Sequence, residues 1–185
     1  MKTSTAHVLR ARATGRLPIA VLLHLFLTLG GPFSRPAEAQ APSPKQSFES
    51  WLLTCENGRP PCYISQSIQL TGTGQRILRV VTGHLGPEGR PILHLTVPLG
   101  IYLPLGVALR VDEGPQHKAE VQTCTTDGCE ATLLLDTALL AALTEGKLTQ
   151  VAFLDAVTRR QITVAVPMAG FRQAHTALQQ QAASR

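Results

Sequence analysis

Short runs in which apolar and polar residues alternate, separated by turns rich in glycine and proline, constrain this chain most. In Val107–Asp112, every second residue is apolar, and the residues between them include Arg110 and Asp112. Because side chains alternate between the two faces of a strand, such a run has one buried face and one solvated face. Comparable runs occupy Ser50–Cys55, Tyr63–Leu70, Arg76–Val81, Pro91–Val97, Lys118–Cys124, Glu130–Leu135, Gln150–Asp155 and Gln161–Val166. Together they predict about nine short strands.

Two segments depart from this period of two and predict helices. Asp136 is suited to cap a short helix over Thr137–Thr144, and Gly146 can end it. After Pro167, a terminal helix is indicated by an apolar stripe at helical spacing, made of Phe171, Ala174, Ala177 and Leu178. The sequence therefore predicts a mainly β fold, an antiparallel β-sandwich with one short internal helix and one C-terminal helix.

The first 39 residues have the three parts of a secretory leader. The first 17 positions hold basic residues and no acid, an apolar run covers Ile19–Leu29, and Ala37-Glu38-Ala39 has the form that signal peptidases cleave. The apolar run is shorter than the ~20 residues that a spanning helix needs. We therefore expect a signal peptide over residues 1–39, a flexible lead-in over 40–47 and a single β-sandwich domain over 48–185. No transmembrane segment is expected after leader cleavage.

The positive net charge of the chain comes mostly from this leader. Of 17 Lys and Arg and 12 Asp and Glu, residues 1–39 hold five basic residues and one acid, which leaves 12 basic and 11 acidic residues. Nucleic-acid binding needs a cluster of uncompensated cations, so the near-neutral remainder argues against a nucleic-acid partner. The densest basic spot left is Arg159-Arg160, which we interpret as a solvated hairpin tip.

All four cysteines follow the leader, and an even number in an exported chain predicts disulfides. Cys124 and Cys129 are separated by four residues, whereas redox motifs have two between their cysteines. Structural zinc sites also use tighter spacing. Two local bonds are favoured, Cys55 to Cys62 and Cys124 to Cys129, each worth about 2 to 2.5 kcal/mol by loop entropy. A cross-link between the loops, such as Cys62 to Cys124, stays open.

No catalytic, cofactor-binding or metal residue is assigned from the sequence. A nucleophile elbow of the form G-x-S-x-G is absent from the chain. The acidic candidates lack calcium-loop spacing, and they are Asp112, Glu113, Asp127 and Asp136. Asp127 is better explained as a turn former and Asp136 as a helix cap. A zinc site assembled from scattered histidines stays open, and the histidines after the leader are His84, His94, His117 and His175.

Trp51 is the only tryptophan, and two roles are open to it. It can pack in the core near Cys55, or it can stand exposed as an aromatic anchor for a sugar or a partner. Aromatic side chains bury 150 to 250 Å² each, and this chain has few of them, which favours the core.

Several residues in a fixed order resemble the invasion-associated locus B family of exported bacterial proteins. The matching elements are Trp51-x-x-x-Cys55, Cys62-x-x-x-Gln66, Pro98-Leu-Gly100, Leu103 to Gly106, Val111-Asp112, Cys124, Gly128-Cys129-x-Ala131, Gly146, Val151-Ala152-Phe153 and Gly170-Phe171-x-x-Ala174. The resemblance implies a β-sandwich in the periplasm, at the outer membrane or outside the cell. The family is named for a member's part in the invasion of host cells, and it brings no known catalytic residue, cofactor or defined receptor.

These observations favour an exported, non-enzymatic protein that binds a partner, either an unidentified protein or an envelope component. Two alternatives are a periplasmic structural or assembly factor, and a hydrolase or metal-dependent enzyme whose site is assembled from distant strands. The absence of a catalytic motif in the sequence favours the binding hypothesis over the enzymatic one.

Overall fold

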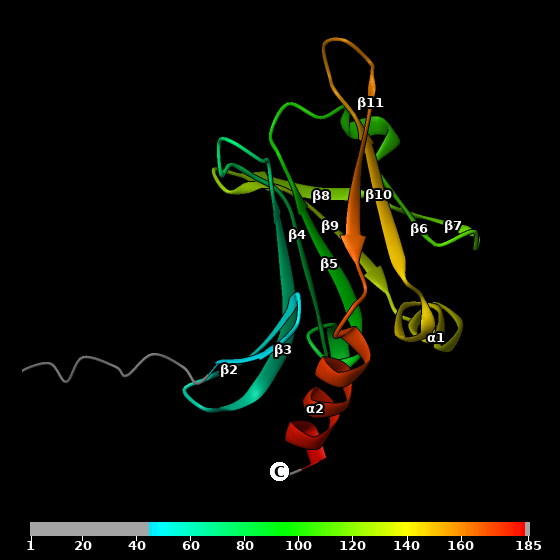
Figure 1. Ribbon diagram of the computed structural model, residues 1–185. Coiled ribbons are helices and arrows are strands. Elements are labelled where there is room, and N and C mark those ends of the chain that lie inside the picture. The colour runs from blue at the N-terminus through cyan, green and yellow to red at the C-terminus, as the bar shows by residue number, and fades with distance from the viewer. Residues whose placement is uncertain (1–44, 184–185) are drawn as a thin grey trace, which may run out of the picture. The chain divides into compact units, whose positions relative to one another are not determined.

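The computed structural model describes residues 45–183, and this part of the chain is a two-sheet β fold (Figure 1). The seven-stranded sheet has the order β1-β2-β3-β4-β5-β9-β8, and the four-stranded sheet has the order β11-β10-β6-β7. Neighbouring strands pair antiparallel in both sheets. This arrangement confirms the predicted mainly β sandwich with a C-terminal helix. The predicted leader lies outside the described residues.

The strands are β1 Lys45–Phe48, β2 Trp51–Glu56, β3 Arg59–Gln69, β4 Arg76–Gly83, β5 Ile92–Val97, β6 Val107–Val111, β7 Gln116–Ala119, β8 Val121–Thr125, β9 Gly128–Leu134, β10 Leu148–Leu154 and β11 Gln161–Pro167. The helices are α1 Thr137–Glu145 and α2 Phe171–Ala183, with 3-10 turns η1 Pro87–Gly89 and η2 Leu103–Leu105. Neither α-helix is long and apolar enough to cross a membrane.

The described residues form eleven strands, not about nine, for two reasons. Residues 45–47, which we expected in the lead-in, pair with β2 as part of β1. The run Lys118–Cys124, predicted as one strand, divides at Glu120 into β7 and β8, which belong to different sheets. The chain can change sheets here because Gly106 packs directly against the Ala119 carbonyl, where any Cβ would collide. Gly106 also has a φ of 66°, which glycine adopts without strain.

The inner faces of the two sheets form one apolar core. In β6, Val107, Leu109 and Val111 are buried, as their alternation predicts, whereas Arg110 is exposed. A void of only about 10 Å³ remains where side chains from both sheets and α1 meet. Such close packing leaves little space for a ligand between the sheets.

Helix α1 follows the predicted capping pattern. The Asp136 carboxylate accepts a 2.7 Å hydrogen bond from the Leu139 backbone N–H, which satisfies one of the free donors at the helix start. Leu139 and Leu143 are buried on the inner side of the helix. At the other end, the Gly146 N–H donates to the Ala142 carbonyl at 2.7 Å. Helix α1 therefore contributes apolar side chains to the core, and Asp136 acts as its N-cap.

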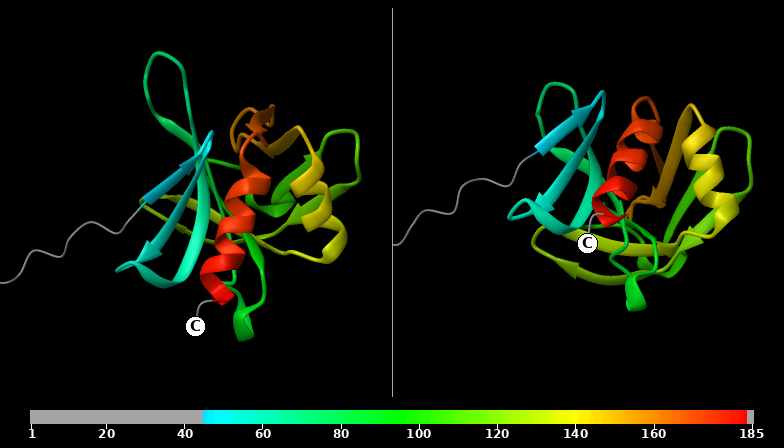
Figure 2. Two further views of the ribbon diagram at one scale, coloured as in Figure 1. Left: turned by 60° about the horizontal axis from the view of Figure 1, so that its bottom comes forward. Right: turned by 90° about the horizontal axis from the view of Figure 1, so that it is seen from below.

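Helix α2 packs on β1, β2 and β3 (Figure 2). Phe171, Ala174 and Leu178 are buried, as the predicted stripe requires. The Trp51 indole meets the Phe171 ring edge to face at 4.8 Å, and its N–H donates to the Pro167 carbonyl at 3.2 Å. Trp51 is 1% exposed, which confirms the core role and contradicts the exposed aromatic anchor.

Replacement of Phe171 by alanine tests this junction. We expect Phe171→Ala to lower the free energy of unfolding by about 3 to 5 kcal/mol, because it leaves a cavity beside Trp51. Urea denaturation followed by tryptophan fluorescence measures the change. The control is Val157→Ala at an 88% exposed position, which should shift stability by less than about 0.5 kcal/mol. Equal losses in the two variants would contradict a junction role for Phe171.

Candidate functional site

The four cysteines form two pairs of directly opposed residues on neighbouring strands. The Sγ atoms of Cys55 on β2 and Cys62 on β3 are 2.13 Å apart. Those of Cys124 on β8 and Cys129 on β9 are 2.14 Å apart. The two local pairs favoured by spacing thus lie at disulfide distance, and no cysteine of residues 45–183 is left over for a cross-link between the loops.

The acidic residues considered for catalysis or calcium have structural roles or lie apart. The Asp112 carboxylate accepts hydrogen bonds from the Lys147 and Leu148 N–H groups, at 3.1 and 2.9 Å, and so joins the end of β6 to the start of β10. The Asp127 N–H donates to Thr125 Oγ1 at 3.2 Å within its turn. Asp136 caps α1, and Glu113 is exposed to solvent. Structural hydrogen bonds therefore account for the carboxylates of Asp112 and Asp136, whereas Asp127 takes part in its turn through its backbone.

The histidines also lie apart from one another for the most part. His94 Nδ1 is 3.1 Å from Thr132 Oγ1 on the neighbouring strand, and His84 Nδ1 is 3.0 Å from the Gly89 carbonyl oxygen. The His175 ring lies parallel to that of Phe171 at 6.0 Å, and burial, followed by the charge of His84, lowers the pKa of His175. No group of three or more His, Cys, Asp or Glu side chains within residues 45–183 is placed to hold a metal ion.

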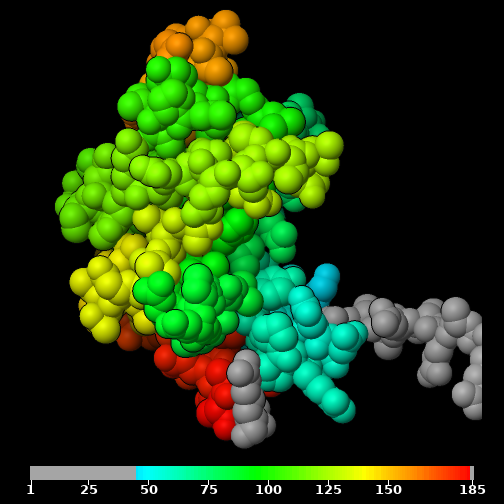
Figure 3. All heavy atoms as spheres, turned by 180° about the vertical axis from the view of Figure 1, so that it is seen from behind, coloured from blue at the N-terminus to red at the C-terminus, as the bar shows by residue number. Residues whose placement is uncertain are grey.

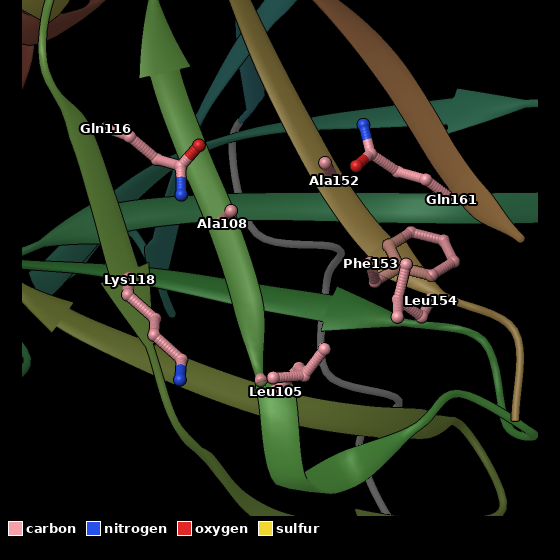
Figure 4. A pocket seen from close by; sticks show the side chains of 9 residues that line it. Leu105, Ala108, Gln116, Lys118, Ala152, Phe153, Leu154 and Gln161 are labelled. Carbon is pink, nitrogen blue, oxygen red and sulfur yellow. The ribbon is translucent and has the colours of Figure 1, made fainter. Parts of the chain in front are cut away.

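The outer face of the four-stranded sheet carries a depression of about 280 Å³, which we call the sheet hollow (Figure 4). It is lined by Leu105, Gly106, Ala108, Gln116, Lys118, Ala152, Phe153, Leu154 and Gln161. Ala108 and Ala152 are direct neighbours in the register of β6 and β10. Because both side chains are single methyl groups, they form a low floor between the longer side chains of the flanking strands.

The side chains that border the sheet hollow differ in chemical character from one side to the next. Gln116 and Lys118 rise from β7 on one side, and Gln161 rises from β11 on the other, while Leu105 and Leu154 border one end (Figure 4). The hollow therefore combines amide groups that can donate and accept hydrogen bonds with a cation and apolar surface. A few polar groups around an apolar floor are typical of binding sites.

A second depression of about 140 Å³ extends the sheet hollow along the same face. It shares Ala108, Gln116, Ala152 and Gln161 with the first, and it adds Leu109, Arg110, Gln150 and Thr163. Neither depression is lined by a carboxylate. Lys118 and Arg110 form no ion pair with another residue of the described range. Their charges are therefore available to a ligand on this face.

Sequence reasoning missed the sheet hollow. Alternation along Val107–Asp112 already predicts that Ala108 and Arg110 face outward, and both lie on the outer face. It does not predict that Ala108 lies beside Ala152, because the pairing of β6 with β10 is set by contacts between distant segments. The one available signal was a pair of alanines at outward positions of two strands, where polar residues are more usual.

Comparisons with known proteins agree on one family. Residues 51–179 match the family model described as Invasion associated locus B (IalB) protein. Two invasion protein B homologs from Brucella abortus, strain 2308 and biovar 1 strain 9-941, are each 26% identical over 104 residues. Those alignments cover 55% of this chain and 60% of each relative.

A solved structure extends the likeness to three dimensions. The crystal structure of invasion associated protein B from Bartonella henselae superposes with a TM-score of 0.66 at 25% sequence identity. The match covers 74% of this chain and 96% of the Bartonella chain. The two-sheet architecture is thus that of a known protein over nearly its whole length.

The two cysteine pairs differ in burial, which predicts the order in which they are reduced. Cys55 and Cys62 are both buried, whereas Cys124 is exposed on the edge strand β8. Because a thiolate must reach a sulfur atom to break the bond, we expect dilute reductant to open Cys124–Cys129 first under native conditions. Alkylation at timed intervals followed by peptide mass spectrometry measures the order. Earlier labelling of Cys55 and Cys62, or a Cys62–Cys124 peptide before reduction, would contradict this assignment.

Proposed function

Because the chain belongs to the invasion-associated locus B family, we propose that it is an exported, non-enzymatic protein that binds a partner and contributes to host-cell invasion. The partner is a protein or an envelope component, and its contact surface is the sheet hollow. The observation that carries this proposal is the Ala108–Ala152 floor between Gln116, Lys118 and Gln161.

The chemistry of the sheet hollow supports binding. It is open along the outer face of a sheet, so an extended ligand can lie across it without any rearrangement of the core. Its glutamine side chains can both donate and accept hydrogen bonds, and Lys118 can pair with an acidic group. A ligand would cover the alanine floor and the nearby leucines, and burial of that apolar surface favours the complex.

The roles of the acidic and histidine side chains support the non-enzymatic part of the proposal. Asp112 and Asp136 accept backbone hydrogen bonds, and His94 lies against Thr132. General acid–base catalysis most often uses a histidine or a carboxylate beside the substrate site, and none of the residues that line the sheet hollow is an acid or a histidine.

Export is supported by the sequence and by the cysteines. The first 39 residues have the order of a secretory leader, and both cysteine pairs lie at disulfide distance. Disulfides persist in oxidising compartments such as the periplasm or the cell exterior. We place the protein in one of these, where it can meet either envelope components or a host surface.

Filling the sheet hollow tests the proposed function. We expect Ala152→Trp to weaken saturable binding at least tenfold, because the indole occupies the space above the alanine floor. The measurement is the binding of fluorescently labelled secreted protein to cultured animal cells and to envelope fragments of the bacterium that produces it. Circular dichroism establishes that each variant is folded.

The control is Ser67→Trp, which adds the same side chain at an exposed position of β3 in the other sheet, outside both depressions. It should bind as the unchanged protein does. Saturable binding that survives Ala152→Trp would exclude the sheet hollow as the contact surface. A protein that binds neither surface would overturn the proposed binding function itself.

A further inference from the structure

One end of the domain formed by residues 45–183 carries an unusual number of exposed apolar side chains. Two segments form it, residues 98–106 and residues 154–162, which we call the apolar tip. Of the nine large apolar side chains that are exposed within residues 45–183, five belong to the tip: Leu99, Leu103, Leu105, Val157 and Ile162. Val157 is 88% exposed and Leu99 is 57% exposed. Exposed apolar side chains gathered in one place mark a surface that meets an apolar partner.

The two segments of the apolar tip are held together by backbone contacts. The Tyr102 N–H donates to the Leu154 carbonyl at 2.7 Å, and the Ala156 N–H donates to the Gly100 carbonyl at 2.8 Å. Ile101 and Asp155 form an isolated antiparallel bridge between them. The apolar side chains are therefore presented on an ordered support rather than on two independent loops.

The turn of the β10–β11 hairpin is also fixed internally. Asp155 Oδ1 accepts hydrogen bonds from the Val157 and Thr158 N–H groups, at 3.1 and 2.7 Å, and from Thr158 Oγ1 at 2.8 Å. These bonds lower the pKa of Asp155, the Thr158 backbone bond most strongly. The carboxylate is thus turned toward its own loop, while the Val157 side chain in the same turn is exposed.

The charges of the apolar tip have one predominant sign. Residues 98–106 contain no charged residue, and residues 154–162 contain Arg159, Arg160 and the single acid Asp155. The Arg159 guanidinium lies 3.5 Å from the centre of the Tyr102 ring, which holds this cation against the other segment. Both arginines are exposed. The tip therefore presents aliphatic side chains bordered by cations.

We propose that the apolar tip docks on the surface of a lipid bilayer that contains anionic headgroups. Aliphatic side chains that enter the acyl boundary, together with cations at headgroup level, are the two elements of peripheral membrane binding. The position of the hairpin agrees with this occupant, because it projects beyond the rest of residues 45–183 with residues 98–106 beside it (Figures 1 and 3). A projecting tip can enter a deformable bilayer without a preformed groove.

Docking at the tip also orients the binding face. Leu105 and Leu154 belong both to the apolar tip and to the border of the sheet hollow. A tip in contact with lipid therefore holds one end of the hollow close to the membrane. The lipid proposal does not depend on the hollow, since a protein whose hollow is filled by Ala152→Trp still carries the complete tip.

Vesicle binding tests the proposal. The secreted protein, with its N-terminus determined by mass spectrometry, is sedimented with vesicles of phosphatidylglycerol and phosphatidylcholine in equal amounts, or of phosphatidylcholine alone. We expect binding to the anionic vesicles that weakens as salt rises. Val157→Asp should lower this binding at least tenfold, and Arg160→Gln should lower it about fivefold. Ala152→Trp should leave it unchanged.

The matched controls are Leu85→Asp and Arg90→Gln, which make the same kinds of change at an exposed leucine and an exposed arginine in the β4–β5 connection, far from the hairpin (Figure 1). They should bind as the unchanged protein does. Failure of the unchanged protein to bind, equal binding to both kinds of vesicle, or full binding by Val157→Asp would overturn the proposal. So would a dimer in solution that Val157→Asp converts to a monomer, because the tip would then be an interface between two copies.

Discussion

The contact between Trp51, Phe171 and the Pro167 carbonyl is the interaction on which the rest of the structure depends. Trp51 lies at the start of β2 in the seven-stranded sheet, and its two partners flank the passage from β11 to α2. The indole thereby connects one sheet to the end of the other and to the helix that covers β1–β3 (Figure 2). A buried indole with its N–H satisfied contributes a large apolar area at no polar cost.

The filled core limits where a ligand can bind. The inner faces of both sheets are occupied by the core, and the void where side chains of both sheets and α1 meet has a volume of only about 10 Å³. The disulfide-distance pairs and the carboxylates of Asp112 and Asp136 support turns, strand ends and a helix start. The surfaces that we assign to function are the outer face of the four-stranded sheet with its alanine floor, and the apolar tip beside it.

Local patterns in the sequence predicted the local structure well. Alternation found the strands, Asp136 and Gly146 set the bounds of α1 to within one residue, and the stripe from Phe171 to Leu178 found α2. These features depend on neighbours along the chain, so their physical cause is contained in a short stretch of residues. The burial of Trp51 was also foreseen, although its partner Phe171 was not, because 120 residues separate the two.

Features that depend on contacts between distant segments of the chain could not be predicted from local sequence patterns. One predicted strand divides at Glu120 between two sheets, and Gly106 of a separate segment leaves the room that the Ala119 carbonyl occupies there. Ile162 alternates with Val164 and Val166 but is 42% exposed, since it lies near the hairpin end and beyond the core. The neighbouring positions of Ala108 and Ala152, and hence the sheet hollow, follow from a strand register that no local pattern encodes.

Hydrogen–deuterium exchange of the bound protein tests the central claim, that contact is made by the outer face of the four-stranded sheet and the tip. The protein is compared free and bound to the cells, envelope fragments or vesicles that retain it. The account predicts slower exchange in peptides from residues 98–118 and 148–163, with little change in β2–β4 and α2. Protection centred on β2–β4 or on α2, with residues 98–118 and 148–163 unchanged, would contradict it.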